Sequence, residues 1–179
     1  MSLTNEQIMS YINSNSVEDY ENKLRSKDPI GLSDRIALLD EAKHLFQSKI
    51  ALSEMTIFER SIFLGQTKKD GGYPFEINHF GAPKGLGKVQ ALVAKDFSLL
   101  DDFFAAIPRN KLINDVQYFK LIELFKQACH KAQFGNLFPF ALFTRILSIT
   151  RPDTFVPAAA GTVNKLCRMF KLIDKIKIS

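Results

Sequence analysis

The sequence predicts an all-α or α-dominated fold, and three observations support this prediction. Apolar residues recur at helical spacing along most of the chain, strand-like alternation is rare, and helix-capping patterns are frequent. The 179 residues are 46% hydrophobic and include 16 Phe, which is enough apolar material for one packed core. We therefore predict a single compact multi-helix domain over residues 1–179, with a long Gly- and Pro-rich loop at about 65–88.

The first 64 residues contain several helix-start signals. Residue pairs 4 and 7, 16 and 19, and 56 and 59 all have capping-box spacing, in which a Ser or Thr is followed three residues later by Gln, Asp or Glu. Short helices are predicted at 4–12 and from 16 to just before Pro29. A stronger helix is predicted from Ser33, and a shorter one at 53–63. The predicted buried face of the stronger helix consists of Ile36, Leu39, Ala42, Leu45 and Phe46.

The remaining chain alternates between loops and helices. Residues 65–88 hold six of the nine Gly and two Pro, which predicts the long loop. Helical patterns follow at 89–94, 96–106, 110–132, 138–149 and 162–172. The nearly wholly apolar segment 138–149 is predicted to be central in the core. The large residues predicted to be buried are Leu39, Phe46, Phe119, Phe125, Phe143 and Leu147.

Charge is unevenly distributed along the chain. Residues 1–64 carry 7 Lys and Arg against 10 Asp and Glu, whereas residues 65–179 carry 17 against 9. A basic surplus of this kind permits an anionic partner such as DNA. The candidate nucleic-acid contacts are Lys84, Lys88, Arg145, Arg151, Lys165, Arg168 and Lys171.

The loop at 81–89, GAPKGLGKV, resembles a phosphate-binding loop only superficially. In a P-loop, a first glycine precedes the final Gly-Lys pair by a fixed spacing, and a Ser or Thr follows to bind Mg²⁺. Here Ala82 occupies the first glycine position and Val89 the Ser or Thr position. Nucleotide hydrolysis is therefore not expected. The loop either presents Lys84 and Lys88 to an anion or is simply structural.

No catalytic or metal-binding pattern is present, and no cofactor is expected. The histidines, His44, His79 and His130, do not form any metal-ligand spacing. Cys129 and Cys167 lie in helical patterns and are predicted to be buried, reduced thiols.

The Pro152-Asp153 pair superficially resembles the start of a metal-dependent nuclease site. Such a site also needs a following acidic residue and a Lys, and neither occurs at the required spacing. Asp153 is instead expected to cap the turn or to pair with an arginine such as Arg151. We expect Phe155 to insert into the core and Arg151 to be partly exposed.

Residues 142–172 resemble a pattern found in helical modules of bacterial restriction and defence proteins, including McrB-like ones. In that pattern a leucine-rich helix precedes a Pro-Asp-x-Phe turn, a variable loop and a second helix. The residues that match are Leu147, Arg151, Pro152, Asp153, Phe155, Asn164, Leu166, Cys167 and Phe170. The similarity covers about a sixth of the chain. It departs from the pattern at 158–160, where three alanines replace polar residues.

Three functional hypotheses follow from these patterns. The first is a non-catalytic DNA-binding or subunit-binding module of a bacterial restriction or defence system, as the resemblance and the basic surplus imply. The second is a protein–protein interaction or scaffold domain that binds no nucleic acid. The third is an enzyme whose site is assembled from scattered residues. The sequence contains no apolar run long enough for a membrane span and no secretory signal, so a cytoplasmic location is expected.

Overall fold

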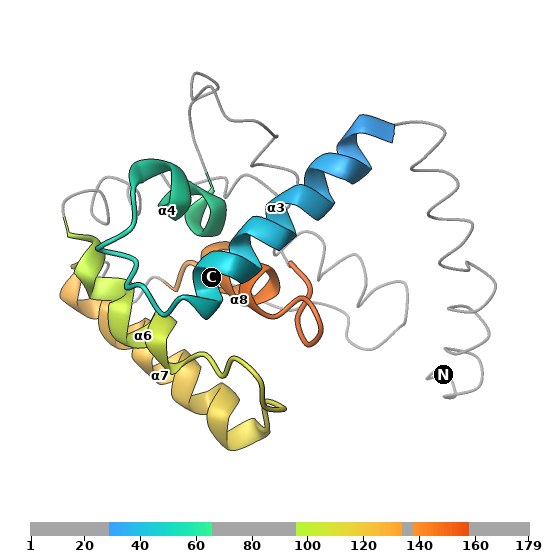
Figure 1. Ribbon diagram of the computed structural model, residues 1–179. Coiled ribbons are helices and arrows are strands. Elements are labelled where there is room, and N and C mark those ends of the chain that lie inside the picture. The colour runs from blue at the N-terminus through green and yellow to red at the C-terminus, as the bar shows by residue number, and fades with distance from the viewer. Residues whose placement is uncertain (1–28, 66–95, 134–137, 158–179) are drawn as a thin grey trace, which may run out of the picture.

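The computed structural model describes residues 29–65, 96–133 and 138–157 (Figure 1). These residues form five α-helices and one 3₁₀ helix and contain no strand, which confirms the predicted α-dominated fold. The elements are α3 (Pro29–Gln47), α4 (Ile57–Leu64), η2 (Phe97–Leu100), α6 (Asp101–Ala106), α7 (Asp115–Lys131) and α8 (Phe140–Thr150). The predicted loop at 65–88 and the predicted helices at 4–12, 16–28, 89–94 and 162–172 lie outside the described residues.

The helix at 53–63 begins later than its apolar pattern indicates, because its cap fixes the start. The Thr56 hydroxyl accepts a hydrogen bond from the Glu59 backbone N–H at 3.3 Å, and the Glu59 carboxylate accepts one from the Thr56 N–H at 2.7 Å. This reciprocal pair is the predicted capping box, and α4 accordingly starts at Ile57.

The starts of α3 and α7 also differ from the predicted ones. Helix α3 begins at Pro29 rather than at Ser33, since proline is well suited to the first turn of a helix. Helix α7 begins at Asp115 rather than near residue 110. Its cap is Asn114, whose side chain accepts from the Gln117 N–H at 2.9 Å.

Helix α8 lies at the centre of the described structure (Figure 1). Every residue from 142 to 150 is buried, which confirms the central position predicted for the segment 138–149. Helices α3 and α4 pack against each other and against α8, and α6 packs beside α7. None of the described helices is sufficiently long and apolar to cross a bilayer.

Phenylalanine rings join these helices into one core. The rings of Phe103, Phe125 and Phe143 come from α6, α7 and α8, and their centroids lie 5.0–5.7 Å apart. The ring of Phe104 makes edge-on contacts with Phe46 at 5.4 Å and with Phe63 at 4.9 Å. Such tilted and edge-on pairs stabilise a core beyond the area that they bury. The two adjacent phenylalanines of α6 therefore connect α7 and α8 on one side to α3 and α4 on the other.

The predicted buried face was correct for α8 and only partly correct for α3 and α7. Phe46, Phe125, Phe143 and Leu147 are buried as predicted. Ile36 is 53% exposed and Leu39 is only half-buried, because Leu38, together with Ala42 and Leu45, forms the buried side of α3. Phe119 is 63% exposed, because α7 turns Leu121, Phe125 and Ala128 toward the core instead.

Replacing Phe125 with alanine tests the observed face of α7. We expect Phe125→Ala to lower the free energy of unfolding by about 3–5 kcal/mol, the usual result of removing a buried Phe. The matched control, Phe119→Ala, removes the same type of side chain from an exposed position. It should change the free energy of unfolding by less than about 0.5 kcal/mol. Urea unfolding measures both values. Equal losses for the two variants would contradict the observed helix rotation.

Candidate functional site

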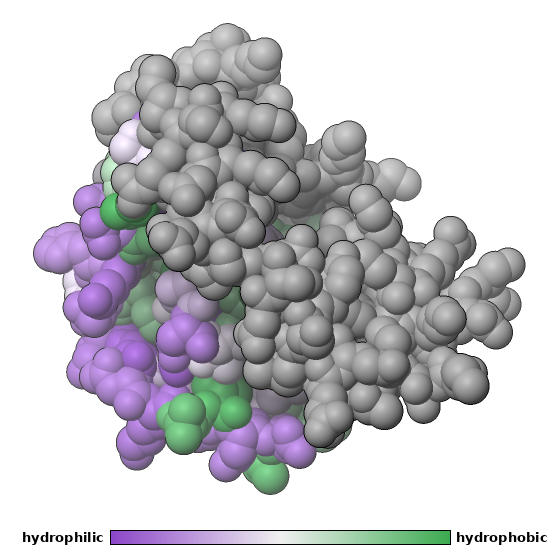
Figure 2. Space-filling view, turned by 90° about the vertical axis from the view of Figure 1, so that its right-hand side faces the viewer, coloured by the Kyte–Doolittle hydropathy of each residue, from purple (hydrophilic) through white to green (hydrophobic). Residues whose placement is uncertain are grey.

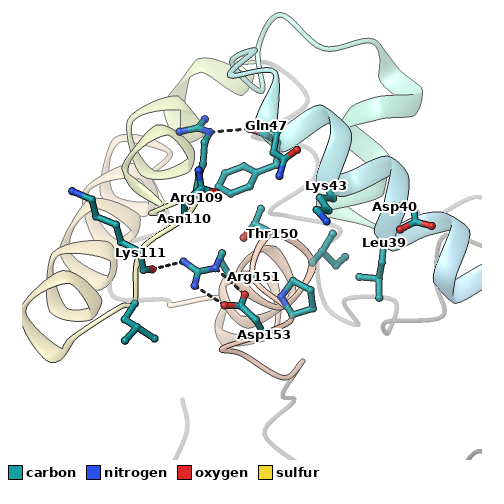
Figure 3. Close-up of a pocket in the computed structure, with 14 residues that line it drawn as sticks. Leu39, Asp40, Lys43, Gln47, Arg109, Asn110, Lys111, Thr150, Arg151 and Asp153 are labelled. Atoms are coloured by element: carbon teal, nitrogen blue, oxygen red, sulfur yellow. Dashed lines mark hydrogen bonds and ion pairs between the residues drawn. The ribbon is translucent and has the colours of Figure 1, made fainter.

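A cavity of about 630 Å³ opens between three segments that are distant in sequence (Figure 3). One wall is the C-terminal half of α3, and the opposite wall is the connecting segment, residues 107–114, which joins α6 to α7. The end of α8 and the turn that follows it form the floor. We call this cavity the groove. Its volume lies in the range of ligand-binding sites in proteins.

The floor of the groove is built around Arg151, whose five N–H donors are all used. Its Nε and Nη2 donate to the two carboxylate oxygens of Asp153 at 2.8 and 2.6 Å, and Nη2 also donates to the Thr154 hydroxyl at 3.1 Å. Its Nη1 donates to the backbone carbonyls of Pro108 and Lys111 at 2.6 and 2.9 Å. The guanidinium thus links the end of α8 to the connecting segment, and we call this set of bonds the Arg151 clamp.

The clamp changes the electrostatics of both charged partners. The side chain of Arg151 is 7% exposed and that of Asp153 is 58% exposed. Hydrogen bonding from Arg151 is the main cause that lowers the pKa of Asp153 from its ordinary value of 3.8 to about 2. The same bond with Asp153 raises the pKa of Arg151. Both groups are therefore charged at neutral pH, and they largely neutralise each other.

The structure corrects the predicted role of Arg151. This residue was expected to be partly exposed and to contact phosphate, but it is buried and has no donor left for a ligand. The predicted pairing of Asp153 with an arginine is confirmed. Phe155 is half-buried and packs against the core, where its ring stacks on Tyr118 at 5.9 Å. These contacts give the Pro-Asp-x-Phe turn a structural role.

Arg145 is also buried, which contradicts its predicted place on an exposed basic surface. It is 1% exposed, and it donates from Nε to the Phe63 carbonyl at 3.2 Å and from Nη2 to the Ile62 carbonyl at 3.0 Å. Carbonyls in the last turn of a helix lack partners within the helix and carry partial negative charge, so a cation stabilises them. Burial lowers the pKa of Arg145 to about 10, which leaves it charged at neutral pH. Arg145 therefore caps the C-terminal end of α4.

Two cations at the groove were not predicted from the sequence, and both have donors that no described residue uses. Arg109 donates from Nε to the Phe46 carbonyl at 2.9 Å, and its guanidinium lies 4.6 Å from the centroid of the Phe46 ring. The terminal nitrogens of Arg109 bond no described residue. Lys43 is exposed on the α3 wall and forms no ion pair within the described part of the chain. Only the fold brings these two residues together, since they are 66 positions apart.

The described part of the chain has no net charge. It contains 11 Lys and Arg and 11 Asp and Glu, so the surplus of +5 for the whole chain arises entirely from the other residues. Five of the predicted nucleic-acid contacts belong to those residues and lie outside the described structure. They are Lys84, Lys88, Lys165, Arg168 and Lys171.

Large apolar side chains are exposed where the connecting segment meets α7. Leu112 is 89% exposed, Val116 78% and Phe119 63%, and we call these three residues the α7 apolar surface. Figure 2 shows hydrophobic side chains at the lower end of the molecule, the end at which α7 lies in Figure 1. Leu112 also lines the groove, so the two features adjoin. Nothing in the helical pattern of 110–132 distinguished this face from the buried one.

The described residues offer little for catalysis. They contain no group of three or more His, Cys, Asp or Glu placed to hold a metal ion. Cys129 is a free, buried thiol, and burial raises its pKa to about 11, so it is a poor nucleophile at neutral pH. The arrangement at the groove is suited to binding through charge and hydrogen bonds.

No protein-family model, curated protein or solved structure matches this chain.

The ion pair of the Arg151 clamp predicts a specific pH dependence of stability. Folding lowers the pKa of Asp153. Its contribution to the free energy of unfolding is therefore complete above its ordinary pKa and is lost as the carboxylate protonates. The wild-type chain should therefore be more stable than Asp153→Asn at neutral pH. This difference should shrink as the pH falls from about 4 to about 2.

Urea unfolding of both chains between neutral pH and about pH 2 measures this difference. The control is Asp40→Asn, which alters an exposed carboxylate that forms no ion pair with a described residue. If the wild-type and Asp153→Asn curves stayed parallel across this range, the ion pair would not contribute to stability.

Proposed function

We propose that this chain is a non-catalytic binding module whose helical body binds another protein. The observation that carries this proposal is the α7 apolar surface, which exposes Leu112, Val116 and Phe119 together at one end of an electrically neutral body. Exposed large apolar residues that gather in one place are typical of protein-binding sites. Their position beside a polar groove matches the usual arrangement of an apolar interface centre with polar residues around it.

Charge supports a protein partner over nucleic acid for this part of the chain. Affinity for nucleic acid depends mainly on Lys and Arg that neutralise phosphates. The described residues have no positive surplus, and Arg145 and Arg151 are used internally. An interface that combines an apolar surface with a few charges needs no such surplus.

A second candidate function is DNA binding by residues outside the described structure. The observation in its favour is that the entire +5 surplus of the chain belongs to those residues. On this proposal the chain is the DNA-binding or subunit-binding module of a bacterial restriction or defence system that the resemblance of residues 142–172 implies. Gel-shift titration at low and physiological salt tests it, since phosphate contacts weaken steeply as salt increases.

Site-specific photo-crosslinking tests the protein-binding proposal. A photoreactive phenylalanine derivative replaces Phe119 on the α7 apolar surface in cells that produce the chain. The matched control places the same derivative at Gln127, an exposed position on the same helix. We expect a protease-sensitive, nuclease-resistant adduct from position 119 only.

The adduct should also depend on the neighbouring apolar residues. Adding Leu112→Ser and Val116→Ser should reduce its yield about tenfold, because apolar burial supplies most of the affinity at such interfaces. An adduct of equal yield from both positions, or a nuclease-sensitive one, would argue against the proposal.

A further inference from the structure

We infer that the groove binds a carboxylate group on an acidic, extended segment of the protein partner. This inference rests on the proposed function and adds the chemistry that the partner must present. It is carried by Arg109 and Lys43, which converge on one cavity with donors that the described protein leaves unused.

Arg109 is held in place before any ligand binds. Its Nε–H bond to the Phe46 carbonyl at 2.9 Å fixes one edge of the guanidinium, and the Phe46 ring supports one face at 4.6 Å. The terminal nitrogens then offer two parallel N–H groups, the geometry that matches the two oxygens of a carboxylate. A group fixed in this way loses less conformational entropy on binding than a free side chain does.

The α3 wall supplies further donors. Lys43 and Gln47 are four residues apart in α3, so they lie on the same side of the helix, and both line the groove. Figure 3 shows Gln47 and the Arg109 guanidinium toward the same end of the groove, with Lys43 further along α3. The Lys111 amine points outward in the same view, away from the Arg151–Asp153 pair. Arg109, Gln47 and Lys43 are therefore the candidate contacts.

The other charges of the groove favour isolated carboxylates over a polyanion. Asp40 and Asp153 also line the groove, and closely spaced phosphates would meet their carboxylates as well as the cations. Arg151 adds no free donor, because its five N–H groups are already bonded. A single acidic side chain seated between Arg109 and Lys43 avoids most of this repulsion.

The shape of the region indicates that the occupant is a segment of polypeptide chain. Leu112 lines the groove and also belongs to the α7 apolar surface, so the two features share this residue and a single bound segment can contact both. The matching segment has an acidic residue followed by apolar residues. A small anion would use the groove and leave the α7 apolar surface uncovered.

Fluorescence anisotropy with the full-length chain tests this inference. The probe is a fluorescein-labelled peptide with one acidic residue, Gly-Ser-Gly-Glu-Leu-Gly-Leu-Ser-Gly, and a second peptide carries Gln in place of the Glu. The variants are Lys43→Gln and Arg109→Gln. The matched control, Lys120→Gln, removes one exposed lysine of α7 outside the groove. Circular dichroism and thermal unfolding establish that each variant is folded.

We expect each groove variant, and the Gln peptide, to weaken binding about tenfold, the effect of losing one charge-assisted hydrogen bond. Lys120→Gln should stay within about twofold of the wild-type chain. Equal weakening by Lys43→Gln and Lys120→Gln, or equal binding of the Glu and Gln peptides, would overturn the inference.

Competition experiments separate carboxylate recognition from phosphate recognition. Inorganic phosphate and a single-stranded oligonucleotide are each added to the wild-type chain with bound peptide. If inorganic phosphate or the oligonucleotide displaced the labelled peptide at a lower concentration than the unlabelled peptide does, the groove would prefer phosphate and the inference would be wrong. If the Glu peptide did not bind the wild-type chain while the crosslink at position 119 still formed, this inference would be refuted and the proposed function would stand.

Discussion

The guanidinium of Arg151 joins the end of helix α8 to the connecting segment, which lines the proposed binding groove. It extends from the end of the buried helix α8, and two of its five donors bond the Pro108 and Lys111 carbonyls of the connecting segment. That segment carries Arg109 into the groove and places Leu112 at the start of the α7 apolar surface. The Arg151 side chain therefore helps to position Arg109 and Leu112, although it offers no donor of its own to the groove.

Two buried arginines explain why a count of basic residues misrepresents this surface. Arg145 and Arg151 lie on or just after the central helix, and each bonds backbone carbonyls from another element. Arginine is suited to this role because its planar fork reaches several acceptors at once and stays charged when buried. Lysine has three donors on a single nitrogen and loses its charge more readily on burial. These charges stabilise the fold and are not available to a partner.

Local signals in the sequence were sufficient to predict much of the fold. The Thr56–Glu59 capping box was predicted from three-residue spacing, and the apolar segment 138–149 indicated a central helix correctly. Neighbouring apolar residues were less informative. Leu38 and Leu39 both fit a helical face, and only packing decided that Leu38 is the buried one. The exposed position of Phe119 had no local signal at all.

The candidate site depended on contacts that sequence spacing does not encode. Arg145 bonds the carbonyls of Phe63 and Ile62, which lie 82 and 83 positions earlier in the chain. Every residue has a backbone carbonyl, so residue types do not show which carbonyls will be bonded. The groove combines Lys43, Arg109 and Arg151 from three separate segments. The pairing of Arg151 with Asp153 was predictable because the two residues are close in sequence, whereas the reach of Arg151 to the connecting segment was not.

Hydrogen exchange in an Arg151→Lys variant tests most directly whether the clamp holds the connecting segment. Lysine retains the charge, but its three donors on one nitrogen cannot replace the five hydrogen bonds of Arg151. If the account is correct, the amides of Ile107 and Asn114, which are hydrogen-bonded within the described structure, should exchange about tenfold faster in the variant, whereas those of α4 should be unchanged. Unchanged exchange at Ile107 and Asn114, with the fold intact, would contradict the account.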